Sequence, residues 1–303
     1  MRIRLLQPVG IGAVLLAAAW AVCWTNCATA QNKPAQTVPE LSPADLEKIE
    51  AALPAKAAAT PKQPRRVLIF WRCEGFFHGQ GIAGGNKAIV GMGEKTGAYT
   101  ADVARDYEVF TPANLAKYDA VILNNTTGLK LSDQQQQALL DFVASGKGLV
   151  GVHAATDNFY NWPEGAKLMG GLFSGHPWGA GGTWAFKLDE PDHSLVRAFG
   201  GQGFKLRDEI YQFKDPYTRD DRRVLISLDL SDKATGDVAA TKGGRKDNDY
   251  AVAWIKNVGP GRLFYCSLGH AHNVFQDAAV NQFYLDGIQF ALGDLPADAT
   301  PKK

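Results

Sequence analysis

Short apolar runs bounded by glycine or charged residues recur along this chain, and they constrain its fold more than any other feature. Val67–Trp71, Ala120–Asn124 and Leu149–Val152 consist almost entirely of apolar residues. Runs of this kind are typical of strands buried on both faces, as in a parallel sheet. Between the second and third runs, Ser132 as N-cap and Gly146 as terminator predict an amphipathic helix. The alternation predicts a three-layer α/β/α sandwich with right-handed crossovers.

The later part of the chain follows a different pattern, with strands joined by short connections. The sequence NVGPG, between two of these strands, predicts a hairpin. We therefore expect a mostly parallel sheet with an added antiparallel hairpin. The strands are predicted at Thr183–Leu188, Glu209–Phe213, Val224–Leu228, Ala251–Ile255 and Arg262–Ser267. The other predicted elements are a glycine-rich loop over 75–85, a helix over 86–95, a short strand over 107–110 and a closing helix over 276–292.

Residues 1–30 have the layout of a signal peptide. Arg2 and Arg4 precede an apolar core, Ile11–Trp24, and Ala28–Ala30 fits a small-x-small cleavage site. The apolar core is shorter than the roughly 18–20 residues that a membrane-spanning helix needs. We therefore expect cleavage near Ala30, export to the periplasm or the exterior, and no stable membrane insertion of the mature chain.

Export has a consequence for the cysteines, because it places the mature chain in an oxidising compartment. Cys73 and Cys266 either pair there or remain buried free thiols, and their spacing does not decide between the two. Lipid attachment through Cys23 or Cys27 is less favoured, because a tryptophan stands where such signals carry leucine.

Composition divides the mature chain into a linker, one domain and a tail. Residues 31–64 are rich in Ala, Pro, Lys and Gln, which predicts a linker. Within it, Ser42 and Asp45 predict a short capped helix, which either packs on the domain or frays in solvent. The domain is expected over 65–295 and a polar tail over 296–303. With a net charge of +1 and no block of basic residues, the chain is not expected to bind nucleic acid.

Histidines stand where predicted strands end. His153 directly follows one apolar run, and His270 follows the last predicted strand and a glycine. In open α/β sheets, ligands bind beyond the carboxyl ends of strands. We therefore expect the imidazoles of His78, His153, His176 and His270 to share one cleft. A single histidine is more often a structural residue that caps a helix or bonds a backbone carbonyl, whereas two or three that converge favour a functional site.

The chemistry of these residues suggests several roles. His153 occupies the position of a nucleophile elbow, where an imidazole is suited to be an acid, a base or a metal ligand. Asp157 is placed to orient His153 or to share a cation with it, and Glu209 is a candidate general base or metal ligand. A divalent metal is left open, because no HExxH motif is present. The candidate metal ligands are His153, His176, Glu209 and His270.

Aromatic residues near the histidines are candidate sugar contacts. Trp178, which follows His176 and a proline, offers a flat face for stacking on a sugar, but it is as often a loop anchor in the core. Trp162 and Tyr211 are further candidate substrate contacts, together with His78 and His176.

Several motifs together resemble the trehalose-utilisation (ThuA-like) family over residues 66–292. In chain order they are VLIFWRCEGFFH, YDAVILNNTTG, FVASGKGLVGVHAATD, GGLFSGHPW, DEIY and VAWIKNVGPGRLFYCSLGH. The resemblance implies a flavodoxin-like fold of the class I glutamine amidotransferase type, and the processing of trehalose-like disaccharides as keto-sugar derivatives. One departure is at His193, which is followed by Ser194 where the family usually has proline.

The resemblance also argues against glutamine hydrolysis. Amidotransferases attack glutamine with a cysteine at the elbow, whereas this chain has His153 there; His270 is placed like the amidotransferase histidine. We expect a lyase, isomerase or hydrolase that acts on a small carbohydrate, a glycoside or keto-glycoside. His153 and His270 would transfer protons, with Glu209 or Asp157 orienting them or holding a cation. The alternatives are a non-catalytic sugar-binding domain and a metal-dependent hydrolase.

Overall fold

The computed structural model describes residues 36–302. The predicted signal peptide, residues 1–30, lies outside the described residues, as does the start of the predicted linker. None of the helices within 36–302 is both long enough and apolar enough to cross a bilayer.

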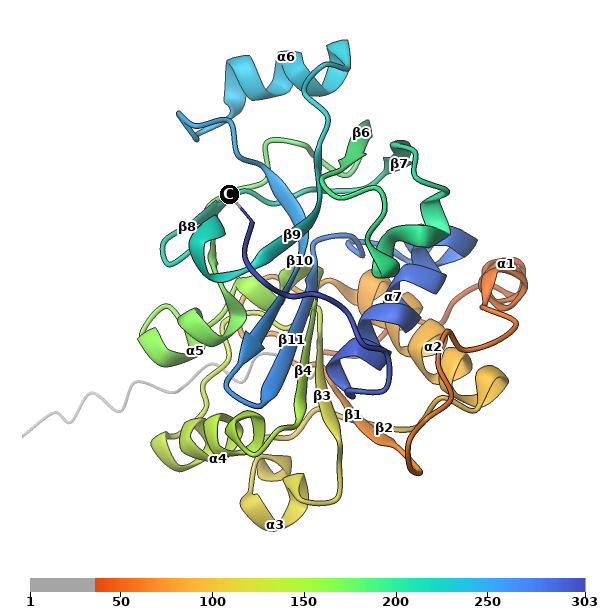
Figure 1. Ribbon diagram of the computed structural model, residues 1–303, viewed down its shortest axis with the longest axis vertical. Coiled ribbons are helices and arrows are strands. Elements are labelled where there is room, and N and C mark those ends of the chain that lie inside the picture. Colours follow the sequence, from red (N-terminus) through yellow and green to blue (C-terminus); the bar gives the residue numbers. More distant parts are fainter. Residues whose placement is uncertain (1–35, 303) are drawn as a thin grey trace, which may run out of the picture. The chain divides into compact units, whose positions relative to one another are not determined.

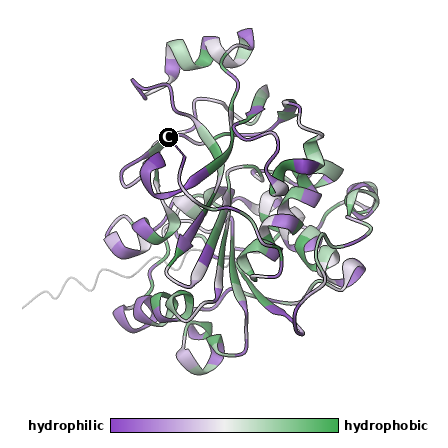
Figure 2. Cartoon of the chain, in the orientation of Figure 1, coloured by the Kyte–Doolittle hydropathy of each residue, from purple (hydrophilic) through white to green (hydrophobic). Residues whose placement is uncertain are grey.

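A nine-stranded sheet forms the centre of the molecule, in the order β2-β1-β3-β4-β11-β10-β9-β6-β7 (Figure 1). The first five strands in this order are parallel, and they follow the flavodoxin-like order 2-1-3-4-5. Except in the edge strand β2, their buried positions carry apolar runs of the sequence, and Figure 2 shows hydrophobic residues along the central strands. The parallel strands are β1 (Arg66–Phe70), β2 (Thr100–Ala104), β3 (Ala120–Asn124), β4 (Gly148–Val152) and β11 (Gly261–Cys266).

The remaining four strands extend the sheet in antiparallel fashion. The predicted hairpin is confirmed, because β10 and β11 pair antiparallel on either side of the NVGPG turn. The antiparallel part is larger than a single added hairpin. Its strands are β6 (Thr183–Leu188), β7 (Phe204–Arg207), β9 (Arg223–Leu228) and β10 (Ala251–Val258), and a separate small sheet pairs β5 (Leu172–Phe173) with β8 (Phe213–Lys214).

Helices cover both faces of the sheet, as the three-layer prediction requires (Figure 1). Each face has its own apolar core: α2 and α7 contribute to one, and α4 and α5 to the other. The first group consists of α1 (Pro43–Ala52), α2 (Gly79–Thr96) and α7 (Ala278–Ala291). The second consists of α3 (Pro112–Leu115), α4 (Asp133–Ala144) and α5 (Pro163–Met169), while α6 (Lys233–Lys242) contacts β6.

The predicted glycine-rich loop is largely helical, because α2 begins at Gly79 rather than near residue 86. The glycines permit close packing of this helix. A Cβ atom at Gly84 would lie 2.6 Å from the Cα of His272, and one at Gly85 would lie 2.6 Å from Oδ1 of Asn124. The low helix propensity of glycine is therefore outweighed by the contacts that only glycine allows.

Two predicted strands also differ from the structure. Tyr107–Val109 is a 3₁₀ turn, and the strand precedes it at Thr100–Ala104. Residues 209–212 are not a strand, since β7 ends before them and β8 begins after them. The short capped helix predicted within 31–64 is present as α1, with Ser42 as its N-cap, and it packs on the domain with Ile49 and Leu53 buried in the core.

Candidate metal centre

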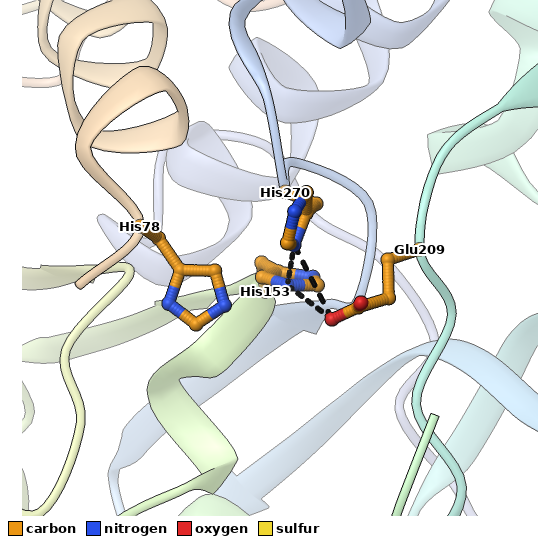
Figure 3. Close-up of side chains that lie close together, drawn as sticks. All are labelled: His78, His153, Glu209 and His270. Carbon is orange, nitrogen blue, oxygen red and sulfur yellow. Dashed lines mark hydrogen bonds and ion pairs between the residues drawn. The ribbon is translucent and has the colours of Figure 1, made fainter. Parts of the chain in front are cut away.

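Four side chains that are far apart in the sequence meet beyond the carboxyl ends of the parallel strands (Figure 3). They are His78, His153, Glu209 and His270, and the ligand atoms that they offer all lie within 4.8 Å of one another. His78 is the N-cap of α2, His153 directly follows β4, and His270 lies beyond the end of β11. Glu209 comes from the segment between β7 and β8. The fold therefore gathers three imidazoles and one carboxylate where such sheets bind ligands.

His153 is held rigidly at the end of β4. Its side chain is fully buried, and its φ angle is +46°, a conformation that costs energy for any residue other than glycine. The Nδ1 atom donates a hydrogen bond to the carbonyl oxygen of Ser267 over 2.7 Å, and the carbonyl of His153 accepts from the hydroxyl of Tyr265 over 2.7 Å. Since Nδ1 carries the proton, Nε2 presents its lone pair to the centre.

The atoms at the centre are spaced like the ligands of one metal ion. Nδ1 of His270 lies 3.3 Å from Nε2 of His153 and 3.2 Å from Oε1 of Glu209. Nε2 of His153 lies 3.8 Å from the same oxygen. Tetrahedral zinc bonds of about 2.0–2.1 Å place ligand atoms about 3.4 Å apart. The three separations bracket this value, so these donors fit a single cation.

The electrostatics of the centre keep two of its imidazoles neutral. Burial, reinforced by the neighbouring imidazoles, lowers the pKa of His78 to about 4 and that of His153 well below its usual value. Burial opposes the charged form of Glu209, but the hydrogen bond with His270 and the charges of the neighbouring imidazoles together outweigh it and lower the pKa of Glu209. Burial likewise opposes the charge on His270, and Glu209 outweighs it and raises the pKa of His270. At neutral pH, His78 and His153 therefore offer free lone pairs beside an ionised carboxylate.

Asp208 fixes the backbone that carries His270. Its buried carboxylate accepts hydrogen bonds from the backbone N–H of Gly269 over 2.7 Å and of His270 over 3.2 Å. Burial raises the pKa of Asp208 to about 7. The sequence does not reveal this contact, because nothing in it shows that Asp208 faces the backbone of a distant loop while its neighbour Glu209 faces the histidines.

His176 and Tyr211 lie at the edge of the centre. Nδ1 of His176 is 3.3 Å from Oε2 of Glu209, and the His176 side chain is 53% exposed. Tyr211 is buried, with its hydroxyl 3.3 Å from Nε2 of His78 and its ring 4.4 Å from that of His153. Glu209 thus directs one oxygen to His153 and His270 and the other to the exposed rim.

Three predicted site residues are placed elsewhere. Trp178 is fully buried, and its indole N–H donates to the carbonyl of Thr235, so it is a core anchor rather than a sugar platform. Trp162 is also buried and packs edge-on against Phe159. Asp157 is outside the group of four, and its carboxylate accepts a hydrogen bond from Tyr160 over 2.6 Å. The residue that orients His153 is therefore Ser267.

His193, Cys73 and Cys266, whose roles the sequence does not define, all lie outside the group of four. His193 is the N-cap of a 3₁₀ helix, where its Nδ1 accepts from the N–H of Leu195. Cys73 and Cys266 are both buried free thiols.

Comparison with known proteins gives one family and several related structures. A family model described as trehalose utilisation, ThuA, matches residues 66–291. A ThuA-like protein from Bacteroides uniformis has a similar structure, with 22% identity, a TM-score of 0.62 and coverage of 77% of this chain and 94% of that chain. A ThuA-like protein from Parabacteroides merdae gives 18% identity, a TM-score of 0.61, and coverage of 78% of this chain and 93% of the other.

A β-galactosidase from Bacillus circulans shows a more distant likeness. Its TM-score is 0.51 at 14% identity, over 84% of this chain and 34% of the enzyme. Among curated protein sequences, none matches the chain. At these identities the likenesses show a common fold.

Proposed function

The chain belongs to the trehalose-utilisation (ThuA) family, and from this premise we propose that it is a carbohydrate-processing enzyme with a divalent-metal centre. The ligands are His78, His153, His270 and Glu209, and the substrate is a glycoside or keto-glycoside. The observation that carries the proposal is the meeting of these four side chains within 4.8 Å, two of them imidazoles whose pKa is lowered by burial.

The kinds of ligand atom at the centre favour some cations over others. Three imidazole nitrogens and one carboxylate oxygen suit zinc and other divalent transition metals, whereas calcium and magnesium prefer oxygen ligands. Nδ1 of His270 and Nε2 of His153 face each other at 3.3 Å, so either a proton carried by His270 or a cation lies between them. A bound divalent metal supplies Lewis acidity, which polarises a carbonyl or hydroxyl oxygen.

The protein groups around the centre suit proton transfer next to a carbonyl. Glu209 presents its second oxygen to His176 at the exposed rim, where a substrate C–H or O–H group can approach. A keto-sugar has an acidic C–H beside its carbonyl, so elimination or isomerisation needs one positioned base. Hydrolysis by paired carboxylates needs two facing acids, and Glu209 is the single carboxylate in the group of four.

A second candidate uses the same residues without a metal. The His270–Glu209 pair, 3.2 Å apart with the pKa of His270 raised, has the composition of an acid–base dyad. In this form His270 donates a proton to the leaving group and Glu209 accepts one. Activity that survives complete metal removal would favour this candidate.

We also propose that the protein is exported. This part of the proposal rests on the signal-peptide pattern of residues 1–30. Amino-terminal sequencing of the protein recovered outside the cytoplasm tests it, with a start near Gln31 expected.

The proposed function is tested by metal content and turnover measured together. Protein purified without chelators or a nickel column is analysed for metals, then assayed with trehalose and its keto derivative by chromatography of the products. We expect about one divalent metal per chain, loss of turnover after chelation, and recovery on adding zinc or manganese. Product formation that is independent of metal contradicts the metal centre, and metal binding without any product supports a sugar-binding protein instead.

A further inference from the structure

An exposed aromatic ring borders the candidate metal centre. Phe76 is 64% exposed, more than any other large hydrophobic side chain in residues 36–302. Its ring centroid lies 4.7 Å from that of His78, in an edge-on arrangement, and 6.4 Å from that of His270, with nearly parallel planes. The ring therefore contacts one of the four side chains and stands beside another, while most of its surface faces solvent.

The backbone around Phe76 is tied down, so a loosely held loop does not account for this exposure. The hydroxyl of Thr127 donates to the carbonyl of Phe76 over 2.9 Å. The N–H of Glu74 donates to the carbonyl of Thr127 over 2.7 Å, which joins the segment to the end of β3. A phenyl ring held in water forgoes the stabilisation that burial gives. Its position beside two of the four side chains, rather than its exposure alone, suits it to contact a ligand bound at the centre.

A second set of rings borders the centre next to His176. Phe173 packs against Tyr211 with centroids 4.3 Å apart, and it stacks on His176 with centroids 6.0 Å apart and planes 16° apart. His176 in turn faces Glu209. Contacts thus lead from Phe76 through His270, Glu209 and His176 to these rings, and the three residues in the middle offer polar atoms suited to hydroxyls.

We propose that Phe76 is the platform on which a pyranose ring of the substrate stacks. This inference rests on the proposed carbohydrate function and deepens it. A pyranose has a face of C–H groups and a rim of hydroxyls, so an aromatic ring binds the face while polar groups bind the rim. When the sugar stacks on Phe76, a hydroxyl or carbonyl group on its ring points toward Glu209 and His270. Phe76 thereby selects cyclic sugars over open-chain polyols.

Three variants separate this role from a structural one. Phe76→Ala removes the platform and Phe76→Trp retains an aromatic face. Val103→Ala is the matched control, because Val103 is an exposed hydrophobic residue, 46% exposed, on the edge strand β2. Each zinc-loaded protein is titrated calorimetrically with trehalose, with its keto derivative and with sorbitol as the open-chain probe, and its zinc content is measured.

We expect Phe76→Ala to weaken sugar binding about tenfold with zinc content unchanged. Phe76→Trp should restore binding to within about threefold, Val103→Ala should match the wild type, and sorbitol should bind weakly to all four. Wild-type affinity in Phe76→Ala overturns the inference and leaves the proposed function intact. Loss of zinc from that variant also overturns it, since Phe76 would then support the metal ligands. A zinc-loaded wild type that binds neither sugar overturns both.

Discussion

The Nδ1 atom of His153 lies 2.7 Å from the carbonyl oxygen of Ser267, and this bond joins the end of β4 to the residue that follows β11. A carbonyl oxygen only accepts, so the bond assigns the proton of the imidazole to Nδ1. The lone pair of Nε2 is then available to the other three side chains of the centre. A backbone acceptor of this kind is typical of histidines that bind metals.

Replacing His153 tests the importance of this lone pair. His153→Asn keeps a residue that tolerates positive φ, so the protein should remain folded, with circular dichroism unchanged. We expect metal content to fall to about a tenth of the wild-type value or less and turnover to be lost. His193→Asn is the control, because His193 caps a 3₁₀ helix outside the centre. A His153→Asn protein that retains both metal and activity would remove this residue from the account.

The lowered pKa of His78 predicts how stability depends on pH in metal-free protein. Because the pKa is about 4 when folded and about 6.5 when unfolded, the unfolded state binds more protons between these values. Stability is therefore lost as pH falls from about 6.5 to 4, by up to about 3 kcal/mol from this residue. The pKa of His270 is raised, so the stability that this residue contributes is lost as pH rises rather than as pH falls.

A comparison of wild type with His78→Asn isolates the contribution of His78. Urea unfolding at pH 7 and pH 4.5 should show a smaller loss of stability in the variant. Equal losses in the two proteins would mean that His78 is not held neutral by the fold.

Asp208 should act on the metal through the backbone of His270. Asp208→Asn keeps one acceptor oxygen but loses the negative charge, whereas Asp208→Ala leaves the N–H groups of Gly269 and His270 without their partner. Zinc affinity, measured by competition with a chromogenic chelator, should fall about 10- to 100-fold in the alanine variant and less in the asparagine variant. Asp286→Asn, which alters a buried carboxylate on α7, is the control. Unchanged affinity in Asp208→Ala would contradict the role of Asp208.

Gly81 should be required for the position of His270. An added Cβ would lie 2.6 Å from the carbonyl oxygen of His270 and still closer to that of Gly269. Gly81→Ala should therefore destabilise the protein by about 1–3 kcal/mol and weaken metal binding. Gly181→Ala, where nothing lies within 4 Å of the added atom, should leave both unchanged. Thermal melts and metal titrations of the two variants provide the comparison.

The parallel core was predictable from the sequence because strands buried on both faces are apolar throughout. β3 and β4 follow that rule, with every position buried. β2 lies at the sheet edge, and its sequence TADVA has no such run, so the sequence predicts a strand at 107–110 instead. The glycines of α2 favour a loop by propensity, because the neighbours that require Gly81, Gly84 and Gly85 come from distant parts of the chain, at 124–125 and 269–272.

The histidines of the centre were predictable in the same way, because His153 and His270 follow strands whose carboxyl ends share one edge. The partners that orient them were not. Ser267 acts through its backbone carbonyl, and Asp208 contacts the backbone of a distant loop. No pattern of side chains in the sequence therefore indicates either contact. Residue type predicts Trp162 and Trp178 as sugar contacts, but both side chains are buried. The exposed ring beside the centre belongs to Phe76.

The central claim is that His78, His153, His270 and Glu209 bind one divalent metal, and anomalous diffraction from crystals grown with zinc tests it most directly. The account predicts one strong anomalous peak about 2.0–2.2 Å from one nitrogen or oxygen atom of each of at least three of these side chains, and loss of the peak in His153→Asn. Contradiction would come from crystals that bind zinc at other positions while the space between these four side chains holds no peak.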